Sequence, residues 1–295
     1  MSVAVAPAGR FPGQLRYTPF FNSFRLVKAL IMHPMVQFAL RAARGAAEQF
    51  VRVRERIEVA RNDNDLDTFI ADTARRAEAH IVRQLERGYP QHGLSGRYTD
   101  HRDGEGQGAD YHWRIEPVHG YSNLASASSG FALSVVCLFK GRAEHAVVIA
   151  PFTDEEYIVS RGRGAQHSGH RIRVTNATSI EGARLAMGLP ESWQRPRHLA
   201  TYLSIVQQVG PQLDTLRANG CALLDVLELA AGRVDAVYVL GLEAGDSEIV
   251  SLFLKECGAL AGSADGTPVV VAEGTLMAAG ARLYKALAQT MQPHL

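Results

Sequence analysis

The chain has few cysteines, and their arrangement does not suit a disulfide framework. Its 295 residues include three, Cys137, Cys221 and Cys257, which are scattered and show no CxxC spacing. An odd, scattered set favours a reducing compartment, so we expect a cytoplasmic location. Cys221 is expected to be a small buried residue, with a nucleophile as the alternative.

The sequence also lacks an excess of charge and long apolar runs. Its formal net charge is +1, which provides no global basic field for nucleic acid but leaves room for a local patch. The longest apolar runs, such as residues 130–139, are far shorter than the roughly 20 residues of a membrane helix. With 46% apolar residues, the chain can bury one large core or two fused ones.

Acidic residues are absent from the N-terminal segment 1–31, which carries Arg10, Arg16, Arg25 and Lys28. The segment has neither the continuous apolar stretch nor the cleavage site of a secretory signal. We predict a disordered extension here. A transit peptide and a partner-binding arm are the alternatives.

Apolar residues at helical spacing predict two neighbouring helices. They recur at intervals of three and four from Val36 to Phe50, and again from Ile70 to Leu85 before Gly88. We expect these helices to pack side by side. Beyond them, β-prone runs at residues 131–139, 145–150, 157–160 and 171–174, separated by turn residues, predict an antiparallel sheet.

After about residue 180, predicted strands and helices alternate, which implies a sheet covered by helices. The expected strands are 184–188, 216–218, 236–240 and 269–272, and the expected helices are 198–209, 222–231, 247–257 and 276–288. We therefore predict an N-terminal α+β subdomain over 32–180 and a C-terminal α/β subdomain over 181–295.

The segment Trp113-Arg114-Ile115-Glu116-Pro117-Val118-His119-Gly120-Tyr121-Ser122-Asn123 is the most informative in the chain. It resembles the W-[IV]-[IV]-D-P-[IL]-D-G-T-x-N motif of the inositol monophosphatase family. There, two aspartates and a backbone carbonyl hold Mg²⁺, and the threonine orients the attacking water. The resemblance runs from Met32 to about Leu287, through further matches at residues 89–92, 161–165, 220–225, 230–235 and 241–246.

The opening Met32-His33-Pro34-Met35 and the block Ala230-Ala231-Gly232-Arg233-Val234-Asp235 look closest to the bacterial SuhB branch of that family. The resemblance implies a layered αβαβα sandwich that usually forms homodimers. It also implies a site in which several carboxylates converge on Mg²⁺, a cation that takes octahedral oxygen ligands. In such a site the metals help to deprotonate water and steady the phosphoryl group in transfer.

Most of the residues that this chemistry needs are replaced. At the metal-site positions the chain has Arg97, Glu116, Val118, His119 and Asp246. Arg97 stands for a glutamate and His119 for an aspartate, whereas Glu116 and Asp246 remain acidic. The resemblance therefore implies that two of the acidic ligands persist and two are gone.

The residues that activate water are replaced as well. Tyr121 stands for the threonine, and the D-x-x-T-x-x-D helix start falls on Thr68, Ala71 and Ala74. Asp72 could substitute only if the alignment shifts by two residues. No residue is therefore a confident catalytic candidate.

Arg97 reverses the charge where a ligand should lie. A guanidinium stays protonated, so we expect it to repel Mg²⁺, to pair with Glu116 or Asp246 and to replace the ion structurally, with no metal bound. The alternative is a direct, bidentate phosphate site formed by Arg97 with Gly120, Tyr121 and Ser122.

Three other patterns each have a structural and a functional interpretation. Glu116, His119 and Asp246 could form a transition-metal site, which the nearby Arg97 disfavours. His167-x-x-His170 is expected to be a solvated turn rather than a metal site. Arg161-Gly162-Arg163-Gly164 resembles an RNA-binding element, but the glycines are expected to serve a turn. Asp154-Glu155-Glu156 is expected to be a charged turn.

The predicted function is that of a SuhB-like protein with weak or no Mg²⁺-dependent phosphatase activity. The resemblance implies a second role in ribosomal RNA antitermination, through binding to a transcription elongation factor or RNA polymerase. One alternative is a working Mg²⁺-dependent inositol or sugar phosphate phosphatase, for which we find no complete ligand set. The other is a module that binds a small phosphate ester through Arg97.

Overall fold

The computed structural model describes residues 32–188, 195–242, 244–262 and 274–291. The predictions for residues 1–31 and for a strand over 269–272 lie outside the described residues. The chain from His33 onward forms one compact unit. Within the described ranges, no helix combines the length and the apolar character that a membrane span requires.

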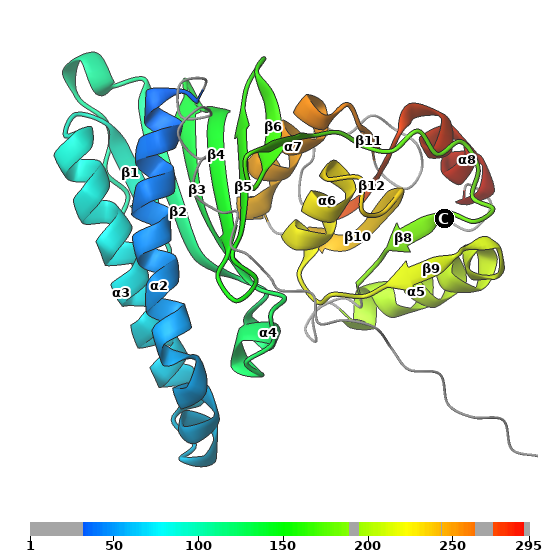
Figure 1. The fold of residues 1–295 in the computed structure, drawn as a ribbon, viewed down its shortest axis with the longest axis horizontal. Helices are drawn as coiled ribbons and strands as arrows, with labels where there is room; N and C mark the ends of the chain where they lie inside the picture. Colours follow the sequence, from blue (N-terminus) through cyan, green and yellow to red (C-terminus); the bar gives the residue numbers. More distant parts are fainter. Residues whose placement is uncertain (1–31, 189–194, 243, 263–273, 292–295) are drawn as a thin grey trace, which may run out of the picture. The chain divides into compact units, whose positions relative to one another are not determined.

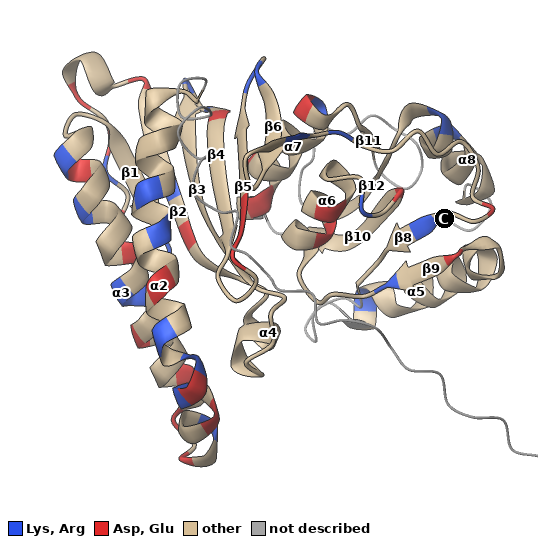
Figure 2. Ribbon diagram, in the orientation of Figure 1, with Lys and Arg blue, Asp and Glu red and all other residues tan. Residues whose placement is uncertain are grey.

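Helices α2 (Pro34–Asn62) and α3 (Leu66–Gly88) lie side by side, as predicted (Figure 1). α2 begins at a proline, which the first turn of a helix tolerates, and the His33 side chain accepts a hydrogen bond from the Met35 amide at 3.3 Å. Acidic and basic residues are interspersed along both helices (Figure 2), so neither presents a continuous surface of one charge.

The first sheet has seven strands in the order β1-β2-β3-β4-β5-β6-β7. Its strands are β1 Gly93–Gly96, β2 Tyr111–His119, β3 Ala132–Phe139, β4 Arg142–Ala150, β5 Glu155–Ser160, β6 Gly164–His167 and β7 His170–Ile172. β1 is parallel to β2, and every other neighbouring pair is antiparallel. The predicted antiparallel sheet is confirmed, although β1, β2 and β6 were not predicted as strands.

The second sheet has five strands in the order β11-β12-β10-β8-β9. Its strands are β8 Arg184–Ala186, β9 Thr215–Arg217, β10 Ala236–Leu242, β11 Leu260–Gly262 and β12 Gly274–Ala279. The helices that alternate with them are α5 Arg195–Val209, α6 Ala222–Ala230, α7 Ser247–Cys257 and α8 Ala281–Met291. Short elements complete the described chain: α4 Tyr121–Ala125, η1 Gly106–Gly108, η2 Gly210–Gln212 and η3 Ala244–Asp246.

The elements stack in five layers, and the predicted αβαβα sandwich is confirmed (Figure 1). α2 and α3 cover one face of the seven-stranded sheet. α6 and α7 lie between the two sheets, where one apolar cluster combines side chains of both sheets with Leu227 and Phe253. A second cluster packs α5 and α8 against the far face of the five-stranded sheet. The predicted subdomain boundary near residue 180 falls between β7 and β8.

The predicted helix over 276–288 is wrong in its first part. Residues 276–279 belong to β12, which pairs antiparallel with β10 and with β11, and they are buried. Leucine, methionine and alanine favour a helix locally, but pairing with two strands inside a layered core outweighs that preference. α8 begins only after Gly280, where any side chain would lie 2.9 Å from the Thr175 carbonyl oxygen.

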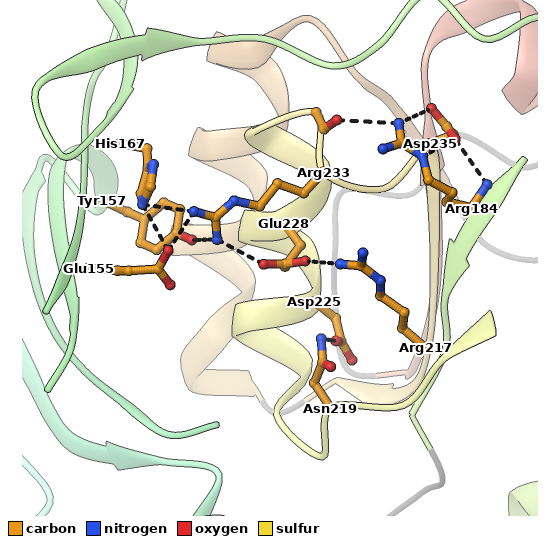
Figure 3. A network of polar contacts seen from close by, with 11 residues as sticks. Glu155, Tyr157, His167, Arg184, Arg217, Asn219, Asp225, Glu228, Arg233 and Asp235 are labelled. Atoms are coloured by element: carbon orange, nitrogen blue, oxygen red, sulfur yellow. Dashed lines mark hydrogen bonds and ion pairs between the residues drawn. The ribbon is translucent and has the colours of Figure 1, made fainter. Parts of the chain in front are cut away.

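A polar network joins the two sheets through α6 (Figure 3). Arg233 donates to Glu155 of β5 at 2.5 Å and to Glu228 of α6 at 3.0 Å. Glu228 also accepts a hydrogen bond from Arg217 of β9 at 2.8 Å. Glu155, Glu228 and Arg233 are called the Arg233 junction below. Arg233 lies in the 230–235 block, so that block connects the layers.

Candidate functional site

The frame of the site is an aromatic cluster built from two of the sequence matches. The Trp113 indole N–H donates to His92 Nδ1 at 3.0 Å, and Tyr89 stacks on the His92 ring. Trp113 is 1% exposed. The cluster fixes the start of β1 against β2, which brings the residues after both strands to the same end of the sheet.

A bulge near the end of β2 turns the chain toward the second sheet. Glu116 pairs with Ser134 of β3, but His119 pairs with Ala132, so three residues of β2 span two of β3. Gly120 follows with a φ of +79°, and a Cβ there would lie 2.8 Å from the Gly130 carbonyl oxygen. Only glycine fits this turn without displacing its neighbours.

The turn borders a cavity of about 310 Å³ between the two sheets. Most of the candidate positions line it: Ala71, Arg97, Val118, His119, Gly120, Tyr121, Ser122, Cys221 and Asp246. The cavity thus brings together the positions proposed for the phosphate site and those of the remnant metal site except Glu116, which contacts Arg97. The other walls include Ile70, Leu223, Val239 and Leu240, which sequence analysis did not select.

The Arg97 guanidinium pairs with Glu116, one of the two partners expected for it. Its Nε donates to Glu116 Oε1 at 2.9 Å, and the Val118 amide donates to the same oxygen at 3.4 Å. Burial raises the pKa of Glu116, while His119 and Arg97 oppose that shift. One of the two acidic residues that the resemblance implies as remaining ligands is therefore in direct contact with a cationic side chain.

The other acidic ligand is in contact with His119. His119 Nδ1 lies 3.0 Å from Asp246 Oδ1, and its Nε2 lies 2.8 Å from Ser134 Oγ. Since a carboxylate only accepts, Nδ1 carries the hydrogen that reaches Asp246. Arg114 adds a parallel contact, because its guanidinium donates to Glu248 at 3.2 Å and to the Gly245 carbonyl at 3.1 Å.

Tyr121 lies where the water-orienting threonine is expected, and it makes a different contact. Its hydroxyl donates to Asp67 at the start of α3. Burial and this hydrogen bond raise the pKa of the phenol to about 12. The ring is 44% exposed and borders the cavity together with Tyr98. A bulky phenol therefore stands where the resemblance implies a small hydroxyl.

Glu78 is a positioning residue that sequence analysis missed. It is fully buried in α3, and its Oε1 accepts hydrogen bonds from the Tyr98 amide at 2.9 Å and the Thr99 hydroxyl at 2.6 Å. These bonds hold the loop that carries Arg97. A glutamate on the apolar stripe of a helix, one turn after Ala74, was the available signal.

Asp225 was also missed. It lines the cavity, is 2% exposed and accepts a hydrogen bond from Asn219 Nδ2 at 2.7 Å. Burial raises the pKa of its carboxyl to about 7, against the opposing effect of Asn219. An acidic residue in the first turn of α6, next to a buried apolar stripe, was the available signal.

The α3 positions divide into three environments. Ala71 lines the cavity, Ala74 is buried in the helix packing and Thr68 is exposed. Asp72 pairs with Arg75 at 2.7 Å on the helix surface. Cys221 is buried, and burial raises the pKa of its thiol to about 12, as suits a small buried residue.

The glycine-rich hairpin serves a turn. Gly162 and Gly164 have φ values of +71° and +87°, and their amides donate to the Glu256 carboxylate of α7 at 2.7 and 2.8 Å. The glycines therefore allow the β5–β6 turn and anchor it to a helix between the sheets.

Two sequence interpretations are wrong in part. The expected turn lies at Ser168 and Gly169 and His170 is exposed, but His167 is half-buried in β6 with Nε2 3.2 Å from Glu155. The charged turn is confined to Asp154, since Glu155 and Glu156 begin β5 and pair with Arg233 and Arg44. In both cases, charged side chains from other segments contact the strand, and local sequence does not show these contacts.

The donor set does not fit a Mg²⁺ centre of the family type. Glu116 is in contact with Arg97, and Asp246 is in contact with His119. Across the described ranges, no three His, Cys, Asp or Glu side chains gather in an arrangement that could hold a metal ion. Mg²⁺ needs several oxygen ligands around one point, which these pairs do not offer.

The fold and this altered site belong to one family. Residues 31–295 match the model of the inositol monophosphatase family, and the chain is a member of that family. It is 39% identical over 265 residues to the Nus factor SuhB of Pseudomonas aeruginosa, covering 90% of this chain and 98% of that protein. It is 32% identical over 265 residues to the Nus factor SuhB of Escherichia coli, with the same coverage. The SuhB-like resemblance is therefore confirmed.

Solved structures agree on the fold. The extragenic suppressor protein SuhB of Bartonella henselae superposes with a TM-score of 0.76 at 20% identity, over 89% of this chain and all of that chain. The inositol monophosphatase of Anabaena superposes with a TM-score of 0.72 at 22% identity, over 88% of this chain and 95% of that chain.

Proposed function

We propose that this chain is a SuhB-like protein with little or no phosphatase activity, which acts by binding the transcription machinery. The observation that carries the first half is the Arg97 guanidinium at 2.9 Å from Glu116, at a position where the family has a metal ligand. A fixed cation repels Mg²⁺, and without the ion the attacking water is not activated.

The replaced water-activating positions support the same proposal. Tyr121 is engaged with Asp67, and Ala71 and Ala74 have no group that could accept a proton from water. Catalysis would need both metal ligation and proton transfer from water, and the residues for each are replaced independently. The chain therefore acts without a bound catalytic metal.

The partner half of the proposal rests on similarity to proteins named as Nus factors. The retained packing motifs and the overwritten site are what a scaffold requires, since partner binding needs a folded surface and no turnover. We propose a transcription elongation factor or RNA polymerase as the partner, and ribosomal RNA antitermination as the process. The scattered, buried thiols suit a cytoplasmic setting.

The scaffold is proposed to be a homodimer. Leu199 and Leu203 of α5 are 39% and 51% exposed, and Leu216 of the edge strand β9 is 38% exposed. An open strand edge beside exposed leucines favours association with a second copy of the chain. Light scattering should give twice the 32.1 kDa chain mass, and Leu216→Lys should shift the protein toward monomer. A monomeric wild-type protein at micromolar concentration would contradict this part.

An activity assay tests the catalytic half. With inositol 1-phosphate and millimolar Mg²⁺, the purified protein should hydrolyse at background. Turnover within tenfold of an intact family member, abolished by EDTA, would establish the working phosphatase instead.

A capture experiment tests the partner half. Pull-down from the cytosol of the source organism should recover RNA polymerase or a transcription elongation factor identified by mass spectrometry. Asp246→Asn should capture equally well, because the amide oxygen still accepts from His119 and the residue is 7% exposed. Loss of capture in a folded Asp246→Asn protein would place the partner at the cavity.

A second candidate function is binding of a small phosphate ester. Arg97, Gly120, Tyr121 and Ser122 line one cavity, which is the observation that favours it. Phosphate esters would then raise the melting temperature through ligand linkage, and Arg97→Ala would abolish that effect. Arg97-dependent stabilisation together with no transcription partner would favour this function over the scaffold.

A further inference from the structure

Three buried side chains form a hydrogen-bonded chain beside the cavity. Ser134 of β3, His119 of β2 and Asp246 of η3 are 1%, 7% and 7% exposed. The distances are 2.8 Å from Ser134 Oγ to His119 Nε2 and 3.0 Å from His119 Nδ1 to Asp246 Oδ1. These hydrogen bonds thus connect the seven-stranded sheet to the segment that joins β10 to α7.

A hydroxyl, an imidazole and a carboxylate in this order have the arrangement of a hydrolase triad. The burial of Ser134 rules out that use, because the residue is 1% exposed and is not part of the cavity lining, so its Oγ is not accessible to a substrate carbonyl. The three groups therefore hold the structure together.

The same two segments are joined a second time. Arg114 of β2 donates to the Gly245 carbonyl and to Glu248, on either side of Asp246. Within the first sheet, Arg97 holds Glu116 of β2, and buried Glu78 holds the loop that carries Arg97. Each acidic residue left from the metal site therefore meets a nitrogen donor of the protein.

We propose that Arg97 and His119 take over the structural work of the metal ions, so that His119 ties the first sheet to the segment before α7, and Arg97 ties the loop after β1 to β2, without a divalent cation. A carboxylate buried between layers needs a compensating donor or ion. In this chain the compensating donor is a side chain of the protein itself. The inference deepens the proposed loss of metal but does not depend on any transcription partner.

Thermal melting of His119→Asp tests the proposal. The substitution places a third carboxylate near Glu116 and Asp246 and removes the cross-link. In EDTA its melting temperature should fall by at least about 5 °C, as expected for a broken buried pair. Adding 10 mM Mg²⁺ should restore part of that loss, whereas the wild-type melting temperature should move by less than about 1 °C.

His145→Asp is a matched control, because His145 is also buried and bonds a serine, with Nδ1 2.9 Å from Ser160 Oγ. Its electrostatic neighbours are Arg163 and His33 rather than carboxylates, so any loss of stability in the variant should show no recovery in Mg²⁺. Ser134→Ala serves if His119→Asp does not fold. It should lower the melting temperature equally in EDTA and in Mg²⁺.

Two outcomes would overturn the inference. One is a saturable rise of several degrees in the wild-type melting temperature with Mg²⁺, which would mean that this chain still uses the ion. The other is a His119→Asp protein as stable as wild type in EDTA, which would mean that the cross-link contributes nothing. Because neither result measures hydrolysis or partner capture, both are distinguishable from failure of the proposed function.

Discussion

The two sheets are connected by polar contacts in two places, and the two places differ in how they relate to the family. The Arg233 junction uses a block that matches the family motif, and Arg233 contacts Glu155 and Glu228 directly. The pocket junction, formed by Arg97, Glu116, His119 and Asp246, occupies positions where the resemblance to the family implies metal ligands. Its contact between layers is His119–Asp246, whereas Arg97–Glu116 lies within the first sheet. Each junction contains ion pairs between side chains. If the pocket junction binds no metal, as we propose, layer packing and metal chemistry are separable in this fold.

The largest effect is expected when the pocket junction is converted to acidic residues. Arg97→Glu with His119→Asp should take Mg²⁺ binding from undetectable to measurable at millimolar concentration by calorimetry, because four acidic groups would then surround the cavity. Hydrolysis should stay at background, since Tyr121 and Ala74 still leave the water unactivated. Mg²⁺ binding to the wild-type protein of similar strength would remove the difference between the junctions.

Asp225 offers a pH test of the cavity wall. Its pKa is raised by burial to about 7 from an ordinary value of 3.8. Between those values the folded state holds a proton that the unfolded chain releases, so this residue makes folding less favourable as pH rises. Asp225→Asn removes this ionisation. From pH 5 to pH 8, its free energy of unfolding should therefore rise by about 3 kcal/mol relative to that of wild type, as measured by urea unfolding.

The pH trend of the difference decides this prediction, since the substitution itself can change packing equally at every pH. A difference that stays constant from pH 5 to pH 8 would show that Asp225 ionises normally. A difference that grows at low pH would have the wrong sign.

The Arg233 junction should be more important for stability than its exposure suggests. Arg233→Ala leaves Glu155 and Glu228 with side chains only 24% and 17% exposed and without that partner. We expect a loss of about 2 kcal/mol in urea unfolding, between the values for exposed and buried pairs. Arg217→Ala is the control, because Arg217 is 43% exposed and should cost less than about 1 kcal/mol. Equal costs would contradict a special role for Arg233.

The smallest effect is expected at the cavity mouth. Tyr121→Phe removes the hydroxyl that bonds Asp67, and because the ring is 44% exposed the loss should be about 0.5–1 kcal/mol. Tyr98→Phe, at a second tyrosine of the same lining, should change stability less. A gain of Mg²⁺-dependent hydrolysis in Tyr121→Phe would show that the phenol alone blocks catalysis.

Sequence patterns predicted elements well where one periodicity ran through the whole element. The helix over 247–257 matches α7 at both ends, and the apolar stripes of α2 and α3 are the buried ones. They failed at residues 276–279, where helix-favouring residues form a strand because two neighbouring strands pair with them. They also missed β1 and β6, four-residue strands with too few apolar residues to show a period.

The sequence by itself determined the family and which residue types stand at the positions where the resemblance implies ligands, since both depend on residue types and their spacing. The sequence also predicted that the Arg97 guanidinium pairs with one of two acidic residues, Glu116 or Asp246. Only the tertiary structure decided that Glu116 takes Arg97 and that Asp246 takes His119, backed by Ser134 and Glu78. Those contacts join residues 15 to 127 positions apart, so they depend on strand register and layer packing rather than on local sequence.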